Sequence, residues 1–316
     1  MEKYKIGTDV GGTNVKIALI DKNGSLVYSN TVPTRAEMGY EYTISNIKQA
    51  IYDLMKETNT DSTKIEGIGF GFPGQIDYDL GIVRTLPNIP GWNNVPLAKI
   101  MEDEFSIPTR VDNDVRCAAL GELNYGAGKG SQNLVCITVG TGIGSGLIIN
   151  GKIVRGASNA AGEIGHIKLQ EQGGPICGCG DTGCLEAFAS GPSIVALALE
   201  YIKGGKSTKY RELATGEITP YIVAEAAKAG DCVAKRIFEI IGEHIGIGLA
   251  SIVNLLNPEK IIIGGGVAEA GDLLLDPIRE TVEKRAMPIQ ANAVSIVSAK
   301  LGNTAGVIGS SLLLGS

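Results

Sequence analysis

The sequence lacks an excess of positive charge, and it lacks an apolar run that approaches the length of a membrane span. Its 316 residues include 28 Lys and Arg against 34 Asp and Glu, which gives a formal net charge of -6. This balance argues against a general electrostatic affinity for nucleic acid or an anionic membrane, so small anions must be bound locally. The segment Met1-Glu-Lys-Tyr-Lys leads straight into an expected strand with no targeting segment. We therefore expect a cytoplasmic protein without a membrane span.

Histidine is also scarce, and one of the two histidines lies close in sequence to three of the six cysteines. The segment 163–186 contains His166, Cys177, Cys179 and Cys184, with glycines between the cysteines that let a short loop fold its sulfurs inward. One imidazole and three thiolates can fill the tetrahedral shell of Zn²⁺. The alternatives are unrelated thiols or a disulfide, but Cys-x-Cys is too close for an easy mutual bridge and no secretory signal indicates an oxidising compartment. The sequence therefore predicts a structural zinc site.

Two carboxylates flank the predicted metal ligands. Glu163 precedes His166 by three residues, and Glu186 follows Cys184 by two. If one nitrogen of His166 binds the metal, the other carries a proton and can donate to a ligand oxygen, while the carboxylates accept from hydroxyls. The alternative for each glutamate is an exposed loop charge. A loop held by zinc would fix all three groups, and such a set is suited to binding a ligand rich in hydroxyls.

A strand, a glycine turn, a second strand, an Asn-Gly pair and a third strand occur twice in the chain. The first copy spans residues 4–28 and the second spans residues 134–154. An Asn-Gly pair between apolar runs is typical of a two-residue hairpin. Together with 44 glycines and 44% hydrophobic residues, the repeat indicates an α/β protein built from two related domains.

The two glycine turns can present bare backbone N–H groups to phosphate oxygens, although glycine hairpins are also common structural devices. The chain lacks Gly-x-x-x-x-Gly-Lys-[Ser/Thr], so any phosphate is not bound by a P-loop. Asp9 could orient the waters of Mg²⁺, or it could simply cap a turn. Three glycines after the strand at 260–263 would let a nucleobase or ribose lie against the backbone. The residues expected to contact the nucleotide or its metal are Asp9, Gly11, Gly12, Thr13, Asn14, Thr141, Gly142, Gly264, Gly265 and Gly266.

A further pair of polar residues follows the short strand at 108–112. Ligands of open α/β sheets bind at the carboxyl ends of the strands, which makes Asn113 and Asp114 candidates for work on a substrate, with Asp114 as general base. The alternative is that Asp112, Asn113 or Asp114 caps the following helix. The proline-rich loop at 86–92 could wall a pocket, with Asn88 bonding a ligand hydroxyl, or Trp92 could simply pack.

These motifs together resemble the sugar kinases of the ROK family (repressors, open reading frames and kinases), most closely those that act on glucose. The most specific element is Glu163-x-x-His166 followed by Cys177-x-Cys179-Gly-x-x-Gly-Cys184-x-Glu186. Asp9-x-Gly-Gly-Thr, Asn113-Asp114 and Gly264-Gly-Gly support it in the right order, and the resemblance covers nearly the whole chain.

The resemblance implies the actin-like ATPase (ribonuclease H-like) fold, with two related α/β domains and a cleft between them. The small domain would comprise residues 1–120 plus a C-terminal helix at 304–316. The large domain, residues 121–303, would carry the zinc loop.

The resemblance also implies ATP-dependent phosphorylation of a hexose at its 6-hydroxyl, most simply glucose to glucose 6-phosphate for glycolysis, with Mg²⁺ and structural Zn²⁺. Asp114 would take the proton from that hydroxyl. The other hydroxyls would be held by Asn88, Asn113, Glu163, His166 and Glu186, and zinc by His166, Cys177, Cys179 and Cys184. The lysine that usually follows Gly-Gly-Thr in the family is replaced here by Asn14.

Several alternatives stay open. Fructose, N-acetylglucosamine, N-acetylmannosamine or allose could replace glucose, and ADP or polyphosphate could replace ATP. A sugar-responsive repressor of the same family would need a DNA-reading helix pair ahead of the first strand, and Asp9 comes too soon to leave room for one. A non-catalytic sugar-binding or filament-forming actin relative would not need Asn113-Asp114 beside a hydroxyl site. We expect a homo-oligomer, a dimer or tetramer, that binds sugar and nucleotide but no nucleic acid.

Overall fold

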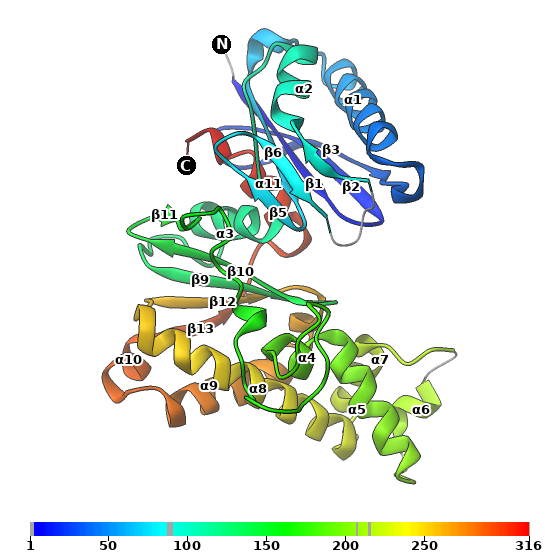
Figure 1. The fold of residues 1–316 in the computed structure, drawn as a ribbon, viewed down its shortest axis with the longest axis vertical. Helices are drawn as coiled ribbons and strands as arrows, with labels where there is room; N and C mark the ends of the chain where they lie inside the picture. Colours follow the sequence, from blue (N-terminus) through cyan, green and yellow to red (C-terminus); the bar gives the residue numbers. More distant parts are fainter. Residues whose placement is uncertain (1–2, 87–90, 207, 214–215, 316) are drawn as a thin grey trace. The chain divides into compact units, whose positions relative to one another are not determined.

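The computed structural model describes residues 3–86, 91–206, 208–213 and 216–315, and Figure 1 labels its main elements. Contacts divide the chain into two compact units. Unit 1 comprises Met1–Gly130, Gly146–Gly162 and Lys300–Ser316, and unit 2 comprises Ser131–Ser145 and Glu163–Ala299.

The first sheet has five strands in the order β3-β2-β1-β4-β8. These strands are β1 (Tyr4–Val10), β2 (Asn14–Ile20), β3 (Leu26–Pro33), β4 (Ile65–Phe72) and β8 (Thr109–Asn113). The neighbours β1, β4 and β8 run parallel, whereas β2 is antiparallel to both β1 and β3. The register places Asp9 opposite Gly71, and Gly71 opposite Asp112. The carboxyl ends of three parallel strands therefore meet at one edge of this sheet, where the sequence places Asp9, Asn113 and Asp114.

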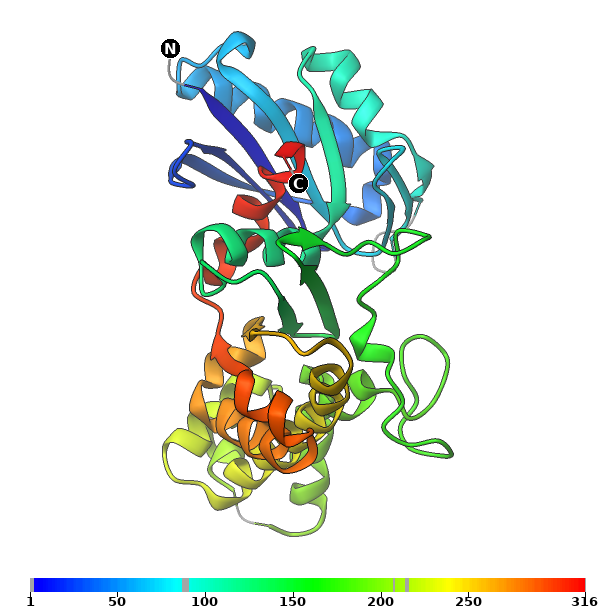
Figure 2. The same cartoon turned by 90° about the vertical axis from the view of Figure 1, so that its left-hand side faces the viewer.

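Helices cover both faces of the first sheet (Figures 1 and 2). On one face lie α1 (Tyr40–Glu57) and α2 (Leu97–Phe105), and on the other lie α3 (Asp114–Tyr125) and α11 (Ala305–Ser310). The alternation along β2 fits this arrangement, because Ile17 and Leu19 pack in the core with α1 while Ala18 and Ile20 pack with α11. Shorter elements complete this part of the chain: β5 (Gln75–Asp77), β6 (Ile82–Thr85), β7 (Asn93–Val95), η1 (Ala36–Met38), η2 (Ser62–Lys64), η5 (Gly302–Thr304) and η6 (Leu313–Gly315).

Helix α11 lies directly on the backbone of the first sheet because two strand residues there are glycines. A Cβ at Gly7 would lie 1.9 Å from the carbonyl oxygen of Val307, and one at Gly69 would lie 1.7 Å from that of Ser310. No side chain fits in that space. Helix α11 therefore packs against β1 and β4, the strands that contain Asp9 and Gly71.

The second sheet repeats the strand order of the first, as β11-β10-β9-β12-β13. Its strands are β9 (Leu134–Val139), β10 (Ile143–Ile149), β11 (Lys152–Ile153), β12 (Lys260–Gly264) and β13 (Ser295–Ser298). In each sheet the first, fourth and fifth strands along the chain run parallel. The predicted repeat is confirmed, and two α/β domains with equivalent five-stranded sheets make up the actin-like ATPase fold.

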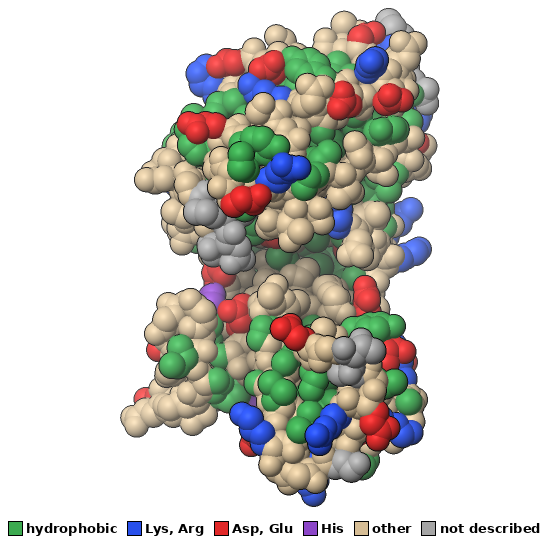
Figure 3. Space-filling model, turned by 90° about the vertical axis from the view of Figure 1, so that its right-hand side faces the viewer, with side chains coloured by type: hydrophobic (Ala, Val, Ile, Leu, Met, Phe, Trp, Pro, Cys, Tyr) green, Lys and Arg blue, Asp and Glu red, His purple; other side chains and the backbone are tan. Residues whose placement is uncertain are grey.

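Helices and short turns of unit 2 account for the remaining elements. They are η3 (Ile164–His166), α4 (Leu185–Ala189), α5 (Gly191–Lys203), α6 (Lys209–Leu213), α7 (Pro220–Lys228), α8 (Cys232–Leu256), η4 (Gly266–Ala270), α9 (Asp272–Arg285) and α10 (Pro288–Ala293). Charged side chains of both signs are interspersed over the face shown in Figure 3, as the small net charge suggests.

The expectation that no stretch is long and apolar enough to span a membrane is wrong for α8. By length and composition this 25-residue helix qualifies as a span, the one such helix in the ranges that the structure describes. Half of its apolar window is buried inside the protein. It packs most extensively against α9 and also contacts α4, α5 and α7, as the core helix of a globular unit does.

Candidate sugar, nucleotide and zinc sites

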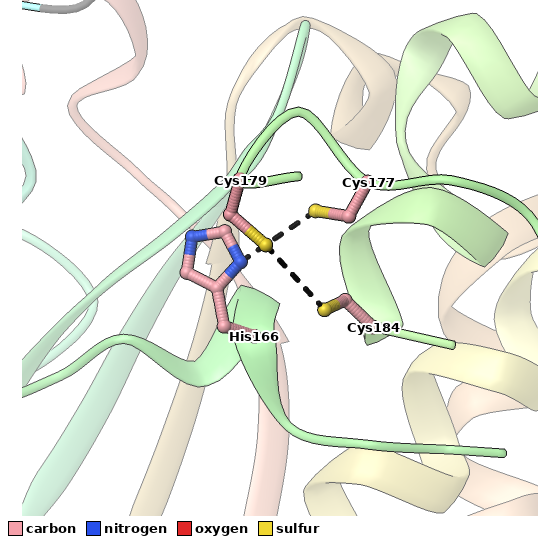
Figure 4. Close-up of side chains that lie close together, drawn as sticks. All are labelled: His166, Cys177, Cys179 and Cys184. Carbon is pink, nitrogen blue, oxygen red and sulfur yellow. Dashed lines mark hydrogen bonds between the residues drawn. The ribbon is translucent and has the colours of Figure 1, made fainter. Parts of the chain in front are cut away.

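The four predicted zinc ligands lie together in unit 2. Figure 4 shows their side chains pointing toward one another, and the four ligand atoms all lie within 4.8 Å of each other. His166 ends η3, Cys184 precedes α4, and Cys177 and Cys179 belong to the loop between them. All six cysteines of the chain are free thiols, so the disulfide alternative is not realised.

The separations within this cluster suit zinc. The sulfurs of Cys179 and Cys184 are 3.8 Å apart, and Cys177 Sγ lies 3.6 Å from His166 Nδ1. A tetrahedral Zn²⁺ with Zn–S bonds of about 2.3 Å and a Zn–N bond of about 2.0 Å separates two sulfurs by about 3.8 Å and a sulfur from a nitrogen by about 3.5 Å. The cluster therefore fits a zinc site of the Cys₃His type.

The loop that carries the cysteines depends on glycine. Gly180 and Gly183 have φ angles of 91° and 76°, in the left-handed region that other residues rarely adopt. A Cβ at Gly183 would also lie 2.1 Å from the carbonyl oxygen of Gln170. The loop thus brings the three cysteines together with the help of glycines at positions 180 and 183.

His166 is oriented as a metal ligand with one free nitrogen. Its Nδ1 faces Cys177 Sγ, while its Nε2 lies 3.9 Å from Oε2 of Glu163. The side chain of Glu163 is 64% exposed and that of His166 is 37% exposed. Metal on Nδ1 leaves the proton on Nε2, so this edge of the ring can donate to a ligand oxygen beside an available carboxylate.

Glu186, in the first turn of α4, connects the zinc loop with the second glycine turn. Its Oε1 lies 3.5 Å from Cys177 Sγ, and its Oε2 accepts a hydrogen bond of 2.9 Å from the backbone N–H of Ile143. A Cβ at Gly142 would lie 2.3 Å from Oε2 of Glu186. Glycine is therefore needed at position 142 to make room for this carboxylate as well as to expose the backbone.

Two backbone hydrogen bonds fix the second glycine turn, residues 140–142. Gly140 N donates to Gly142 O at 2.9 Å, and Gly191 N donates to Gly140 O at 2.7 Å. Thr141, at the tip of the turn, is exposed. The turn is thus a fixed backbone platform whose hydroxyl and N–H groups can face a small anion.

Gly264, Gly265 and Gly266 form the end of β12 and the start of η4. Gly265 has a φ of 86°, and a Cβ there would lie 2.4 Å from the carbonyl oxygen of Val139. Gly266 lines a small cavity of about 80 Å³ beside Tyr221 and Phe238. These two aromatic residues were not predictable from the sequence, because they lie on α7 and α8 and come close to Gly266 only in the folded chain.

The first glycine turn lies between β1 and β2 in unit 1. Gly11 N donates to Asn14 O at 2.9 Å, and Thr34 N donates to Thr13 O at 2.8 Å. A Cβ at Gly12 would meet nothing within 4 Å, so the backbone there is open to a ligand.

Lys16 was missed by the sequence analysis. Its Nζ lies 3.9 Å from Oδ2 of Asp9 and donates to the carbonyl oxygen of Asn303 at 3.0 Å. Lys16 is two residues beyond Asn14 on β2, so both side chains lie on the same face of the strand. This spacing of two residues from Asn14 is the signal in the sequence that could have indicated Lys16. Lys16 supplies a cation near Asp9, although Asn14 replaces the lysine of the resembled family.

Asn113 ends β8 and Asp114 begins α3, and the two residues have different surroundings. Asn113 is the N-cap, since its side-chain oxygen accepts from the N–H groups of Val115 and Arg116 at 3.0 and 3.2 Å. Asp114 is half-buried, and its Oδ1 accepts from the N–H of Val115 at 2.9 Å. No ion pair involves Asp114 among the described residues.

Two half-buried carboxyl groups with raised pKa values lie at this edge of the sheet. Burial and then the negative charge of Asp9 raise the pKa of Asp114 to about 6. Burial also raises the pKa of Asp9, although Lys16 works in the opposite direction. A carboxylate with a pKa near neutrality suits general-base catalysis.

Asp112, beside this pair, has a structural role. It is fully buried and receives Arg116 Nη1 on Oδ1 at 3.1 Å and Arg155 Nε on Oδ2 at 2.8 Å. Arg116 also donates to the carbonyl oxygens of Asn159 and Ala161, both at 2.9 Å. The network fixes the start of α3 and hence the position of Asp114.

The expected contribution of Asn88 falls at residues 87–90, outside the described residues. Trp92, from the same loop, is 4% exposed and packs against Phe72, with ring centroids 4.9 Å apart. The structure therefore favours the packing alternative for Trp92.

Fold and site together define a two-domain α/β protein of the actin-like ATPase class with a zinc loop beside one glycine turn. The chain belongs to the ROK family, whose model matches residues 5–316. It is similar to the glucokinase of Halalkalibacterium halodurans, with 41% identity over 318 residues that cover 99% of this chain and 95% of that protein.

A solved structure and a regulator extend this comparison. The ROK family glucokinase from Streptomyces griseus, in complex with glucose and AMPPNP, has a TM-score of 0.83 and 34% identity, covering 98% of both chains. A xylose repressor from Caldicellulosiruptor bescii is 34% identical and covers 96% of this chain and 76% of its own. Both kinases and repressors are therefore among the relatives.

Proposed function

We propose that this protein is an ATP-dependent sugar kinase that phosphorylates glucose at its 6-hydroxyl. The observation that supports this most is Asp114, a half-buried carboxylate at a sheet edge, with a pKa raised to about 6 and no cationic partner among the described residues. A regulator that only binds sugar has no need for such a group.

In this proposal Asp114 accepts the proton of the 6-hydroxyl as that oxygen attacks the terminal phosphorus of ATP, and the bond from that phosphorus to the bridging oxygen breaks to release ADP. Phosphoryl transfer requires mainly alignment and charge stabilisation, so one correctly placed base and several fixed donors are sufficient. Asp9 would hold the Mg²⁺ that accompanies ATP, which would stabilise charge on the phosphates, and Lys16 adds a positive charge beside Asp9. The two glycine turns offer backbone N–H groups to the phosphates, and the cavity beside Gly266 accepts the base.

The sugar is held through its other hydroxyls. Glu163, His166 and Glu186 present two carboxylates and one ring N–H from a loop that zinc would keep rigid. Asn113 contributes its side-chain Nδ2, which in the structure lies 3.4 Å from Gly74 O. Asn88 completes the proposed set.

Support for glucose over other hexoses comes from the glucokinases among the relatives. A coupled assay of ADP release with MgATP tests this directly, with glucose, fructose, allose, N-acetylglucosamine and N-acetylmannosamine as acceptors. We expect glucose to have the largest kcat/KM. Turnover that is higher with another hexose would correct the substrate, and no ADP release with any of them would refute the kinase.

The repressor similarity gives the second candidate, a sugar-responsive regulator without turnover. It is distinguished by a sugar that binds in calorimetry but releases no ADP from MgATP. We also place the protein in the cytoplasm, because thiolate zinc ligands persist in a reducing compartment. A dimer or tetramer stays a prediction, for which sedimentation is the test.

A further inference from the structure

With Zn²⁺ bound, the cluster of His166, Cys177, Cys179 and Cys184 would carry a net negative charge. Zn²⁺ with three thiolates and one neutral imidazole carries a net charge of about -1. Glu186 adds negative charge, since its Oε1 lies 3.5 Å from Cys177 Sγ. Cys177 and Cys184 are both buried. Negative charge that is shielded from water is costly unless a cation lies against it.

Lys168 lies against this cluster on the side of Cys184. Its Nζ is 3.3 Å from Cys184 Sγ and donates to the carbonyl oxygen of Thr182 at 2.6 Å. The backbone determines this contact, because Lys168 and Cys184 form an antiparallel bridge and Leu185 N donates to Ile167 O at 2.8 Å. Residues that are directly opposite in an antiparallel pair share one face. The ammonium group is therefore directed at the sulfur by the fold of the loop.

We propose that Lys168 is the counter-ion of the zinc–thiolate cluster and retards loss of the metal. Its ammonium donates a charge-assisted hydrogen bond to Cys184 Sγ, which lowers the charge on that thiolate and disfavours its exchange for water. Asp181, with an oxygen 2.5 Å from the same Nζ, holds the ammonium from the exposed side. Lys168 is thus a positioning residue for the loop at 163–186.

Variants at position 168 separate charge from hydrogen bonding. K168M removes both, K168Q keeps N–H donors without charge, and K168R keeps charge and donors. Lys284 gives a matched control, because it lies on α9, is 73% exposed and pairs with Glu280 at 3.3 Å without contacting a thiolate. K284M removes an equivalent surface ion pair.

The measurement is the rate at which zinc-loaded protein transfers its metal to a colorimetric chelator at fixed ionic strength, with zinc content by atomic absorption. We expect release about 10- to 100-fold faster in K168M and K168Q than in the parent. K168R and K284M should release zinc at close to the parental rate. Parental rates in K168M and K168Q, or a K168R as fast as K168M, would overturn the role of Lys168.

The assay does not depend on turnover, so failure of the kinase proposal does not affect it. A parent protein that contains no zinc refutes the metal assignment itself. If K168M fails to fold by circular dichroism, K168Q is judged by the same rate criterion.

Discussion

Asp9 and Asp114 lie at one edge of the first sheet, and the charge of Asp9, together with burial, raises the pKa of Asp114 to about 6. The proposed general base is therefore mostly protonated only below about pH 6. As the pH rises through about 6, Asp114 loses its proton and becomes able to accept one from the sugar.

The pH profile of kcat/KM for glucose should show this ionisation. Below about pH 6 we expect kcat/KM to fall about tenfold per pH unit, with a plateau above it. Steady-state kinetics between pH 4.5 and 8 in buffers of constant ionic strength measure this fall in kcat/KM. A flat profile down to pH 5 would show that no group with this pKa acts in the free enzyme.

Asp114→Asn should make the protein more stable at pH 8 than the parent. A carboxyl whose pKa is raised in the folded state gives its full stabilisation below its unfolded pKa and loses it as the pH rises through about 6. Thermal unfolding followed by circular dichroism should thus show a higher Tm for the variant at pH 8 and little difference at pH 4. The exposed pair of Lys99 and Asp103 supplies the control, and Asp103→Asn should shift Tm at neither pH.

Gly142→Ala should weaken sugar binding through Glu186. The added methyl group would meet Oε2 of Glu186 at 2.3 Å, so the carboxylate must move away from the N–H of Ile143. We expect KM for glucose to rise about tenfold, which corresponds to about 1.4 kcal/mol. Gly140→Ala places a methyl group in the same turn with nothing within 4 Å, and it should leave KM for glucose nearly unchanged. If both substitutions raised KM for glucose equally, the effect would come from the backbone of the turn and not from displacement of Glu186.

Cys179→Ser should remove zinc and loosen the loop that carries Glu163, His166 and Glu186. Cys179 is the exposed member of the cluster, so the core does not depend on its side chain. We expect substoichiometric zinc and glucose affinity at least about tenfold lower by calorimetry. Cys232→Ser, at an exposed cysteine outside the cluster, is the control for loss of a thiol. A zinc-free Cys179→Ser protein with parental glucose affinity would separate the metal from sugar binding.

Asp112→Asn should destabilise unit 1. Asp112 is fully buried between Arg116 and Arg155, and the amide leaves at least one of these guanidinium groups without a charged partner. We expect a loss of about 3 kcal/mol in the free energy of unfolding. Urea denaturation measures it, and a loss below about 1 kcal/mol would mean that water reaches the pair.

The zinc ligands and the duplicated sheet were predictable because each depends on short spacings. Three cysteines within eight residues and a histidine before them leave few chemical alternatives, and the repeated strand and Asn-Gly pattern reads directly as hairpins. The position of Asp114, after a strand and at the start of a helix, was also predictable from the neighbouring residues.

Contacts between distant segments were not predictable. Lys16 lies beside Asp9 because β1 pairs with β2, and the sequence indicates it only through its spacing of two residues from Asn14. Glu186 and Gly142 are 44 positions apart in the chain, and only folding shows that one makes room for the other. The prediction that no stretch could span a membrane was wrong for α8. A helix buried in a protein core and a helix that spans a membrane can have the same length and the same content of apolar residues.

Whether Asp114 is the base of a glucose kinase is decided by ADP release on adding glucose to the parent and to Asp114→Asn with MgATP, with glucose affinity measured in parallel. We predict that the parent turns over and that the variant loses about 10²- to 10⁴-fold in kcat while its glucose Kd stays within about threefold. Parental kcat in Asp114→Asn, or no glucose-dependent ADP release from the zinc-loaded parent, would contradict the account.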